Sequence, residues 1–306
     1  MNTPDKNLIE EVALIKGISE AFVEKDWYVT QVIRKISKIR YEDFQIIFTG
    51  GTALSKAHGL IQRFSEDIDF RVITYTLAQK SRSEQKRLLS AFKHAVITEL
   101  KTTFQIDEAN ILARNENRFF SIEINYPTFF DPSTALRPHI LVEFTITDLA
   151  LPPVHLPVSS FINELSLQPP EVESIGCTDP VENATDKLSA IVWRIPERER
   201  GQSDDNPDVV RHIHDLSILS DRALSHSGFK SLAIEIINRD DRRSSKIAGL
   251  PIDKKFETVL EILSNEQEYP GEYDRFVKGM SYAPDNVVPS FKEALEKLCL
   301  IINHIL

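Results

Sequence analysis

Apolar side chains recur every three or four positions through the first forty residues of the chain. The recurring positions are Leu8, Val12, Ile15, Ile18 and Phe22. At this spacing a side chain returns to the same side of an α-helix, so the segment is predicted to be mostly helical with one buried face.

A different pattern begins near residue 44. Four apolar side chains within residues 44–48 predict a buried strand, and the glycines at positions 50 and 51 end it. Residues 53–58 return to a helical composition. Residues 67–72 then alternate polar and apolar side chains, which is the period of a half-buried strand. The predicted order is therefore strand, glycine turn, helix, strand.

One long helix and two more strands are predicted before residue 150. Residues 78–103 have a helical pattern, and residues 119–126 and 139–146 are rich in the apolar side chains that strands favour. A proline-containing loop through residues 131–132 and 137–138 separates the two strands.

Five prolines lie between residues 152 and 170. Because proline lacks a backbone N–H, this passage is interpreted as an irregular crossing between two halves of the chain. The pattern is helical almost throughout from residue 181, and no repeat of fixed period occurs. The predicted organisation is an α/β domain over residues 1–170 and a mostly helical domain over residues 171–306.

The composition is that of a globular protein with one large domain or two modest ones. Of the 306 residues, 42% are hydrophobic and 27% are charged. The chain has 36 Lys and Arg against 46 Asp and Glu, a formal net charge of −10. It lacks the overall basic excess of a dedicated nucleic-acid binder, so any contact with phosphate is expected to be local.

Neither a membrane nor an oxidising environment is indicated. No apolar run approaches the ~20 residues that span a bilayer, and the first residues are acidic where a secretion signal is basic and then apolar. Cys177 and Cys299 lie far apart without a CxxC spacing, so we expect neither a disulfide nor a zinc site. The expected location is the cytoplasm, with no membrane partner.

The informative segment for chemistry is residues 49–70. If residues 67–72 form a strand, Asp67 and Asp69 emerge from the same face. Two converging carboxylates are what a pair of Mg²⁺ ions needs for an in-line phosphoryl or nucleotidyl displacement. The turn through Gly50, Gly51 and Thr52 would add backbone N–H groups and a hydroxyl for phosphate. The aspartate pair and the glycine turn are each common in proteins, and the hypothesis of a nucleotidyl-transfer site rests on their occurring together in this order.

A third carboxylate would complete the metal site. Glu143 stands in an otherwise apolar strand, where a charge is costly unless it is paired or binds a cation. Glu123 in the preceding strand is the competing candidate. Glu143 is preferred, and an outward-facing position on a half-exposed sheet is the alternative for either residue.

These residues also resemble a known family. The sequences GGTAL at residues 50–54 and RFSEDID at residues 63–69 are similar to the first motif of the AbiEii/AbiGii toxins, nucleotidyltransferases of the polymerase-β superfamily. TDKLSAIVWR at residues 185–194 resembles the family's lysine-bearing helix, and VRHIHDL at residues 210–216 resembles its arginine-to-aspartate helix. The resemblance implies an α+β fold: an N-terminal polymerase-β-type α/β domain with a mixed sheet, followed by a C-terminal helical domain.

The resemblance implies roles for single residues. Asp67 and Asp69 would hold the catalytic metals, two Mg²⁺ ions. Lys187 would contact the triphosphate of the substrate NTP, which fits the need for a positive charge near departing pyrophosphate. Asp215 would complete the site from the helical half. The two halves are expected to enclose a cleft between them.

Further residues of the nucleotide site are expected around the first motif. By resemblance, Gly50, Gly51 and Thr52 line the phosphate pocket. Ser65, with Arg63, is a candidate for shaping the loop before the first aspartate. Lys56, one helical turn past the glycines, is a candidate for a phosphate contact.

The chain departs from the family pattern at two places. His212 stands where many members carry an acid, and threonine replaces the serine that commonly follows the glycine at position 51. Threonine keeps the hydroxyl, so the second change is minor. His212 and His214 are two apart on a predicted helix and point in different directions, so we interpret them as ordinary polar helix positions rather than a metal pair.

The implied function is that of a toxin in a type IV toxin–antitoxin or abortive-infection system. The enzyme would use Mg²⁺ to move a nucleoside monophosphate from an NTP, with ATP, CTP and GTP as candidates, to an RNA 3′ end such as that of tRNA, with a cognate antitoxin that acts without stable contact. A local RNA path is expected through Lys187, Arg194, Arg198 and Arg200 or through residues 239–246. Alternatives are a protein or an aminoglycoside-like hydroxyl as acceptor, or a catalytically silent binding protein.

Overall fold

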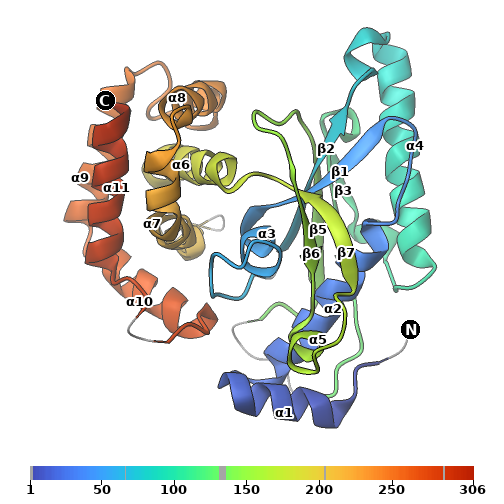
Figure 1. The fold of residues 1–306 in the computed structure, drawn as a ribbon. Coiled ribbons are helices and arrows are strands. Elements are labelled where there is room, and N and C mark those ends of the chain that lie inside the picture. The colour runs from blue at the N-terminus through green and yellow to red at the C-terminus, as the bar shows by residue number, and fades with distance from the viewer. Residues whose placement is uncertain (1–2, 66, 131–135, 203–204, 285–286) are drawn as a thin grey trace. The chain divides into compact units, whose positions relative to one another are not determined.

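The computed structural model resolves the chain into two compact units (Figure 1). It describes residues 3–65, 67–130, 136–202, 205–284 and 287–306. Met1–Gly59 with Phe64–Thr178 form the sheet unit, and Leu60–Arg63 with Asp179–Leu306 form the helical unit. A mixed sheet followed by helices confirms the α+β fold. Residues 60–63 thus belong to the helical unit, although they lie well before the domain boundary near residue 170 that the sequence predicts.

Among the described residues, the strands of the sheet unit form one mixed sheet in the order β3-β4-β5-β2-β1-β7-β6. The strands are β1 Phe44–Thr49, β2 Asp67–Thr74, β3 Leu112–Arg114, β4 Phe119–Ile124, β5 Ile140–Ile146, β6 Val154–Val158 and β7 Val172–Cys177. β2 is parallel to β5 and β1 is parallel to β7, while the other neighbours are antiparallel. The four predicted strands are confirmed as β1, β2, β4 and β5.

The proline-rich passage is more regular than its sequence indicates, and the expectation of an irregular crossing there is wrong. It contributes β6, which includes Pro157, and β7, which begins two residues after Pro170. β6 is the last strand of the sheet, and its register to β7 shifts between Leu156 and Val158. An edge strand tolerates proline because one of its sides forms no ladder hydrogen bonds.

The sheet unit also contains five of the described helices. They are α1 Lys6–Lys16, α2 Glu20–Ile36, α3 Gly50–Lys56, α4 Arg82–Lys101 and α5 Phe161–Leu165. The predicted N-terminal helix is therefore two helices, since Gly17 with φ 67° ends α1. Val12 is buried as predicted, but Ile15 is 58% exposed because Ile9 and Ala13 complete the buried face of α1.

The core of the sheet unit fixes which face of β2 carries the aspartates. Phe70 stacks on Phe144 with ring centroids 5.2 Å apart, and Phe144 stacks on Phe120 at 4.7 Å. α2 and α4 contribute apolar side chains to the same buried cluster, and α4 runs along one side of the sheet in Figure 1. Because side chains alternate along a strand, Phe70 in this core directs Asp67 and Asp69 to the opposite face.

The helical unit confirms the pattern predicted from residue 181. Its helices are α6 Pro180–Glu197, α7 Val210–Ser225, α8 Phe229–Arg239, α9 Ile252–Asn265, α10 Glu268–Met280 and α11 Phe291–Ile305. α6 begins where the Asp179 carboxylate accepts the Val181 N–H at 2.8 Å, with Pro180 at the first helical position. α6 packs on α7, and α7 packs on α11. No helix in the described ranges is long and apolar enough to cross a membrane.

Candidate active site

The two aspartates predicted to bind metal lie on one face of β2. Both are half-buried, whereas Ile68 between them is fully buried. The register places Asp69 directly beside Glu143 of β5, and neighbouring strands are ~4.8 Å apart. Asp67, Asp69 and Glu143 therefore share one face of the sheet.

The structure distinguishes the two candidates for a third carboxylate. Glu123 lies in β4 opposite Leu141, one strand further from β2. Its carboxylate accepts a hydrogen bond from Asn110 Nδ2 at 3.2 Å and lies 3.8 Å from His139 Nε2. Geometry therefore favours Glu143. Within the described ranges, no group of three or more His, Cys, Asp or Glu side chains is already arranged to hold a metal ion.

Asp67 has a cationic partner that the sequence analysis did not single out. Arg137 Nη1 donates to Asp67 Oδ1 at 2.9 Å, and the main-chain carbonyl of Arg137 accepts a hydrogen bond from Lys25 Nζ at 2.8 Å. The Arg137 side chain is 45% exposed, and such ion pairs contribute at most ~1 kcal/mol. A cation that binds Asp67 can therefore replace this contact at little cost. Residues 131–132 of the predicted loop lie outside the described residues.

Glycine at position 50 makes room for the second aspartate. A Cβ built on Gly50 would lie 2.2 Å from Asp69 Oδ2, and Gly50 has φ 76°, a backbone conformation that other residues rarely adopt. Thr49, the residue before it, is the direct neighbour of Asp69 in the β1–β2 register. Any larger residue at position 50 would therefore clash with the Asp69 carboxylate and strain the turn from β1 into α3.

Thr52 and Gly51 of the first motif are buried and contribute to the local fold, whereas the sequence predicts that they line a phosphate pocket. The Thr52 hydroxyl donates to the main-chain carbonyl of Asp67 and is buried, so it holds the start of β2 rather than facing solvent. Gly51 is buried in the first turn of α3. Ser65 is half-buried in the loop before β2, and Glu66 lies outside the described residues.

Lys56 has a partner other than phosphate. Its ammonium group forms a buried ion pair with Asp26 of α2 and lies 5.3 Å from the centroid of the Phe161 ring. Burial raises the pKa of Asp26 while the charge of Lys56 lowers it, with a net increase. A lysine held in this way does not reach a solvent-borne ligand, which argues against the predicted phosphate contact of Lys56.

The helical unit contains a second cluster, formed around a fully buried carboxylate. Asp215 of α7 accepts hydrogen bonds from Arg63 Nε and Nη2, each at 2.6 Å, and its Oδ2 lies 2.6 Å from Lys187 Nζ of α6. Arg63 reaches this cluster because residues 60–63 fold with the helical unit, where Gln62 accepts the Tyr282 N–H at 3.0 Å. The structure thus brings Lys187 and Asp215 together, and adds an arginine that the sequence analysis assigned to a loop.

The neighbouring cations favour the ionised form of Asp215. Burial alone would raise the pKa of Asp215, but the charges of Arg63 and Lys187 hold that pKa well below its usual range. Burial lowers the pKa of Lys187, and the charge of Asp215 partly restores it. Two basic side chains therefore surround one ionised carboxylate in a desolvated site. Asp215 itself is fully buried.

The two histidines of α7 differ in their surroundings. His214 Nδ1 lies 3.3 Å from Asp215 Oδ1 and is buried. Both ring nitrogens of His212 are buried, and neither has a hydrogen-bond partner among the described residues. Burial, followed by the charges of Arg211, Lys187 and Arg194, lowers the pKa of His212 well below its usual value. His212 is therefore neutral at pH 7.

Replacing His212 with asparagine is expected to weaken the loss of stability on mild acidification. The unfolded chain binds a proton at His212 below pH ~6.5, whereas the folded chain does not, so the wild-type protein loses stability as the pH falls through that value. Between pH 7.5 and 5.5 this single group accounts for up to about 1.4 kcal/mol. Urea titrations of both proteins at the two pH values measure it. Equal losses in the wild-type protein and in the variant would show that His212 is protonated in the folded state.

The predicted basic path for RNA is largely internally neutralised. Arg198 donates to Glu272 at 2.7 and 2.8 Å and to Asp205 at 2.7 Å. Arg200 bonds Glu266 at 2.9 Å and also contacts Glu272. In the other predicted segment, acidic neighbours lie beside three of the basic residues, Arg239, Arg243 and Lys246. These side chains stabilise the helical unit and offer less positive charge than their number indicates.

Comparison with known proteins gives a family match for most of the chain. The profile of the family described as nucleotidyl transferase AbiEii toxin, type IV toxin–antitoxin system, matches residues 39–297. The fold is similar to that of MenT4, a nucleotidyltransferase toxin from Mycobacterium tuberculosis, with a TM-score of 0.53 and 15% sequence identity over 97% of this chain and 99% of MenT4. At that identity the likeness shows a shared fold. No curated protein matches the sequence.

Proposed function

Since the chain belongs to the AbiEii family of nucleotidyltransferase toxins, we propose that it transfers a nucleoside monophosphate from an NTP to a hydroxyl group at an RNA 3′ end, such as that of tRNA. Nucleotidyl transfer and a type IV toxin–antitoxin system follow from the family. The RNA acceptor, the magnesium ions and the roles of single residues belong to the proposal. In it the cognate antitoxin acts in the cytoplasm without forming a stable complex with the toxin.

The observation that carries the proposal is the Asp67–Asp69 pair beside the β1–α3 turn. Mg²⁺ prefers oxygen ligands, and both aspartates present carboxylates on one face of β2, where the absence of a side chain at Gly50 makes room for the Asp69 carboxylate. The donor chemistry therefore fits Mg²⁺. We propose that Asp67 and Asp69 hold two ions, with Glu143 as the third carboxylate. When bound, the ions supply charge neutralisation to the reacting phosphate.

The residues of the helical unit would act on the leaving group. In the reaction the acceptor oxygen bonds to the α-phosphorus, and the bond to the bridging oxygen breaks to release pyrophosphate. Lys187 would stabilise the negative charge that develops on the pyrophosphate, because a fixed cation in a desolvated site needs no reorganisation during the reaction. Asp215 would hold the Lys187 ammonium group in place through its 2.6 Å contact, and Arg63 would fix the Asp215 carboxylate through its own two hydrogen bonds at 2.6 Å. Gly50 and Gly51 would admit the phosphates close to the backbone.

Labelling with each NTP in turn tests the proposal. The purified protein is incubated with total RNA, Mg²⁺ and one α-³²P-labelled NTP, beside an Asp67→Ala/Asp69→Ala double variant. Label is expected in a tRNA-sized band only with the intact protein, and the NTP that labels it identifies the transferred nucleotide. A Lys187→Met variant is expected to label the same band more slowly.

Other acceptors would appear in the same experiment. If the protein binds the Mg–NTP complex but labels no RNA with any nucleotide, the RNA acceptor is wrong. Incubation with total protein extract or with an aminoglycoside then distinguishes the two remaining hydroxyl classes. Label transferred equally well by the double variant would instead contradict the assignment of the two aspartates.

A further inference from the structure

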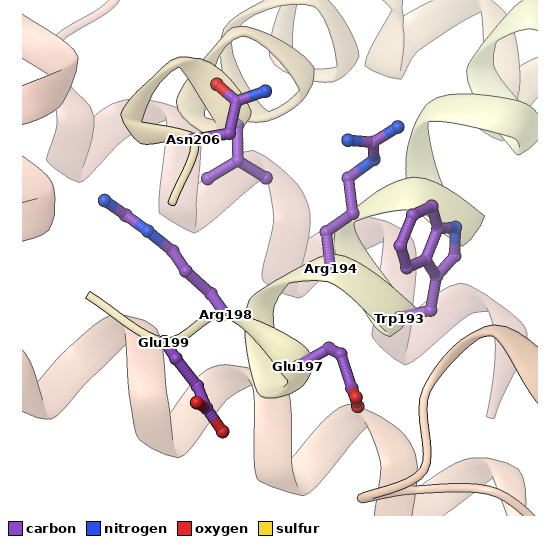
Figure 2. A pocket seen from close by; sticks show the side chains of 7 residues that line it. Trp193, Arg194, Glu197, Arg198, Glu199 and Asn206 are labelled. Carbon is purple, nitrogen blue, oxygen red and sulfur yellow. The ribbon is translucent and has the colours of Figure 1, made fainter. Parts of the chain in front are cut away.

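A cavity of about 120 Å³ lies in the helical unit beside the C-terminal half of α6 (Figure 2). Trp193, Arg194 and Glu197 come from α6, and Asn206 and Val209 precede α7. Arg198 and Glu199 complete the described lining. A volume of this size accommodates about four water molecules, which is the scale of one planar ring system rather than of a folded segment.

The lining combines an aromatic ring with polar groups that are already neutralised. Trp193 is half-buried, and the guanidinium groups of Arg194 and Arg243 lie 4.5 and 5.5 Å from its ring centroid. Glu197 accepts the Ser244 hydroxyl at 2.8 Å and the Ser245 N–H at 3.0 Å.

Across the cavity, Arg198 is bound by Glu272 and Asp205, and Asn206 Oδ1 accepts the Asp208 N–H at 3.0 Å. Because the lining has two carboxylates and its Arg198 is already paired, it does not have the concentrated positive charge of a phosphate site. It suits an uncharged ring with polar edges.

The cavity is close to the lysine proposed to contact the triphosphate. Arg194 follows Lys187 by seven positions on α6, which is about two helical turns, so the two side chains leave the same side of the helix roughly 10 Å apart along its axis. That separation is comparable to the distance between the phosphates of a nucleotide and its base. A nucleotide held at Lys187 by its phosphates, or the strand end that receives it, can therefore extend toward Arg194, whose guanidinium lies beside the Trp193 ring.

From these observations we propose that the cavity beside Trp193 binds a nucleobase. An aromatic face, a guanidinium plane and amide or carboxylate groups at the edge are the side chains that proteins use for unpaired bases. The base comes either from the donor NTP or from the terminal nucleotide of the acceptor RNA. The inference rests on the proposed function for its choice of ligand, but base binding itself is measurable without any transfer reaction.

The first experiment uses the chain's two tryptophans, Trp27 and Trp193. In a Trp27→Phe variant, the fluorescence reports on Trp193 alone. Adenosine, guanosine, cytidine or uridine is expected to quench this emission saturably, whereas ribose 5-phosphate and inorganic pyrophosphate, which carry no base, leave it unchanged.

The matched control is a Trp193→Phe variant, which keeps Trp27 of the sheet unit and is expected to show no quenching. The absence of quenching by all four nucleosides, or equal quenching in both variants, overturns the proposal. Saturable quenching in a protein that labels no RNA would support base binding and contradict only the proposed RNA acceptor. Failure of the base-binding proposal is therefore distinguishable from failure of the proposed function.

The second experiment identifies the source of the base. A Trp193→Ala variant is expected to raise one KM by about tenfold with little change in kcat, since stacking on an aromatic side chain accounts for most of the affinity of a single base. An increase in the KM for the NTP assigns the cavity to the donor, and an increase in the KM for the RNA assigns it to the acceptor. Trp193→Phe is expected to restore most of the affinity, which a merely structural role would not require. Unchanged values of both KM in a folded Trp193→Ala protein overturn the proposal.

Discussion

An Asp69→Asn variant is expected to lose nucleotidyl transfer by about a hundredfold to a thousandfold in kcat, with an unfolded fraction no larger than that of the wild-type protein. The amide keeps the shape of the carboxylate beside Gly50 but removes the negative charge that a divalent cation needs. Transfer of label from α-³²P-NTP, measured over a range of Mg²⁺ concentrations, checks the result. A urea titration confirms that the free energy of unfolding changes by less than about 1 kcal/mol.

Variants of the two glutamates form the matched controls for this prediction. Glu143→Gln removes the carboxylate aligned with Asp69, whereas Glu123→Gln removes one that lies opposite Leu141 and contacts Asn110. We expect the first to raise the Mg²⁺ concentration required for half-maximal rate, and the second to leave it unchanged. Full activity of Asp69→Asn at ordinary Mg²⁺ concentration would contradict the metal assignment, and a larger effect of Glu123→Gln would exchange the roles of the two glutamates.

Local periodicity was sufficient to predict the part of the site that lies within one strand. Alternation along residues 67–72 places Asp67 and Asp69 on one face whatever the partner strand is. The choice between Glu143 and Glu123 required the register of β2 with β5, a pairing of residues more than seventy positions apart. No local pattern specifies such a register, because both glutamates occupy similar apolar strands.

Long-range ion pairs account for the residues whose roles the sequence did not indicate. Lys56 is one turn past the glycines and resembles a phosphate ligand, but Asp26, thirty positions earlier, neutralises it in the folded chain. The sequence places Arg63 in a loop, whereas the fold pairs it with Asp215, which is 152 positions away. Pro157 disfavours a strand because proline cannot donate a ladder hydrogen bond, but β6 lies at the edge of the sheet, where proline is tolerated. In each case the residue's role depends on segments that are distant in the sequence, so local spacing and composition do not predict it.

Replacing Asp215 with alanine is expected to destabilise the helical unit by about 3–5 kcal/mol, because it removes the buried carboxylate that pairs with both Arg63 and Lys187. Urea denaturation followed by circular dichroism measures the change. The pKa of Asp215 is lowered in the folded state, so its contribution is complete above the unfolded value near pH 4 and decreases as the pH falls through it toward the folded value. The difference between wild type and variant should therefore narrow at pH 3.

Asp221→Ala is the matched control on the same helix, since Asp221 also forms an ion pair, with Lys297 at 3.0 Å, but its side chain is 85% exposed. It is expected to leave stability nearly unchanged, because water screens an exposed ion pair. An Asp215→Ala/Lys187→Met double variant should be less destabilised than the sum of the single variants, because removing the lysine also removes a charge that the first substitution leaves unpaired. Strict additivity, or an Asp215→Ala effect as small as that of Asp221→Ala, would mean that water reaches this cluster, and Lys187 would then lack the desolvated surroundings on which its proposed role with pyrophosphate depends.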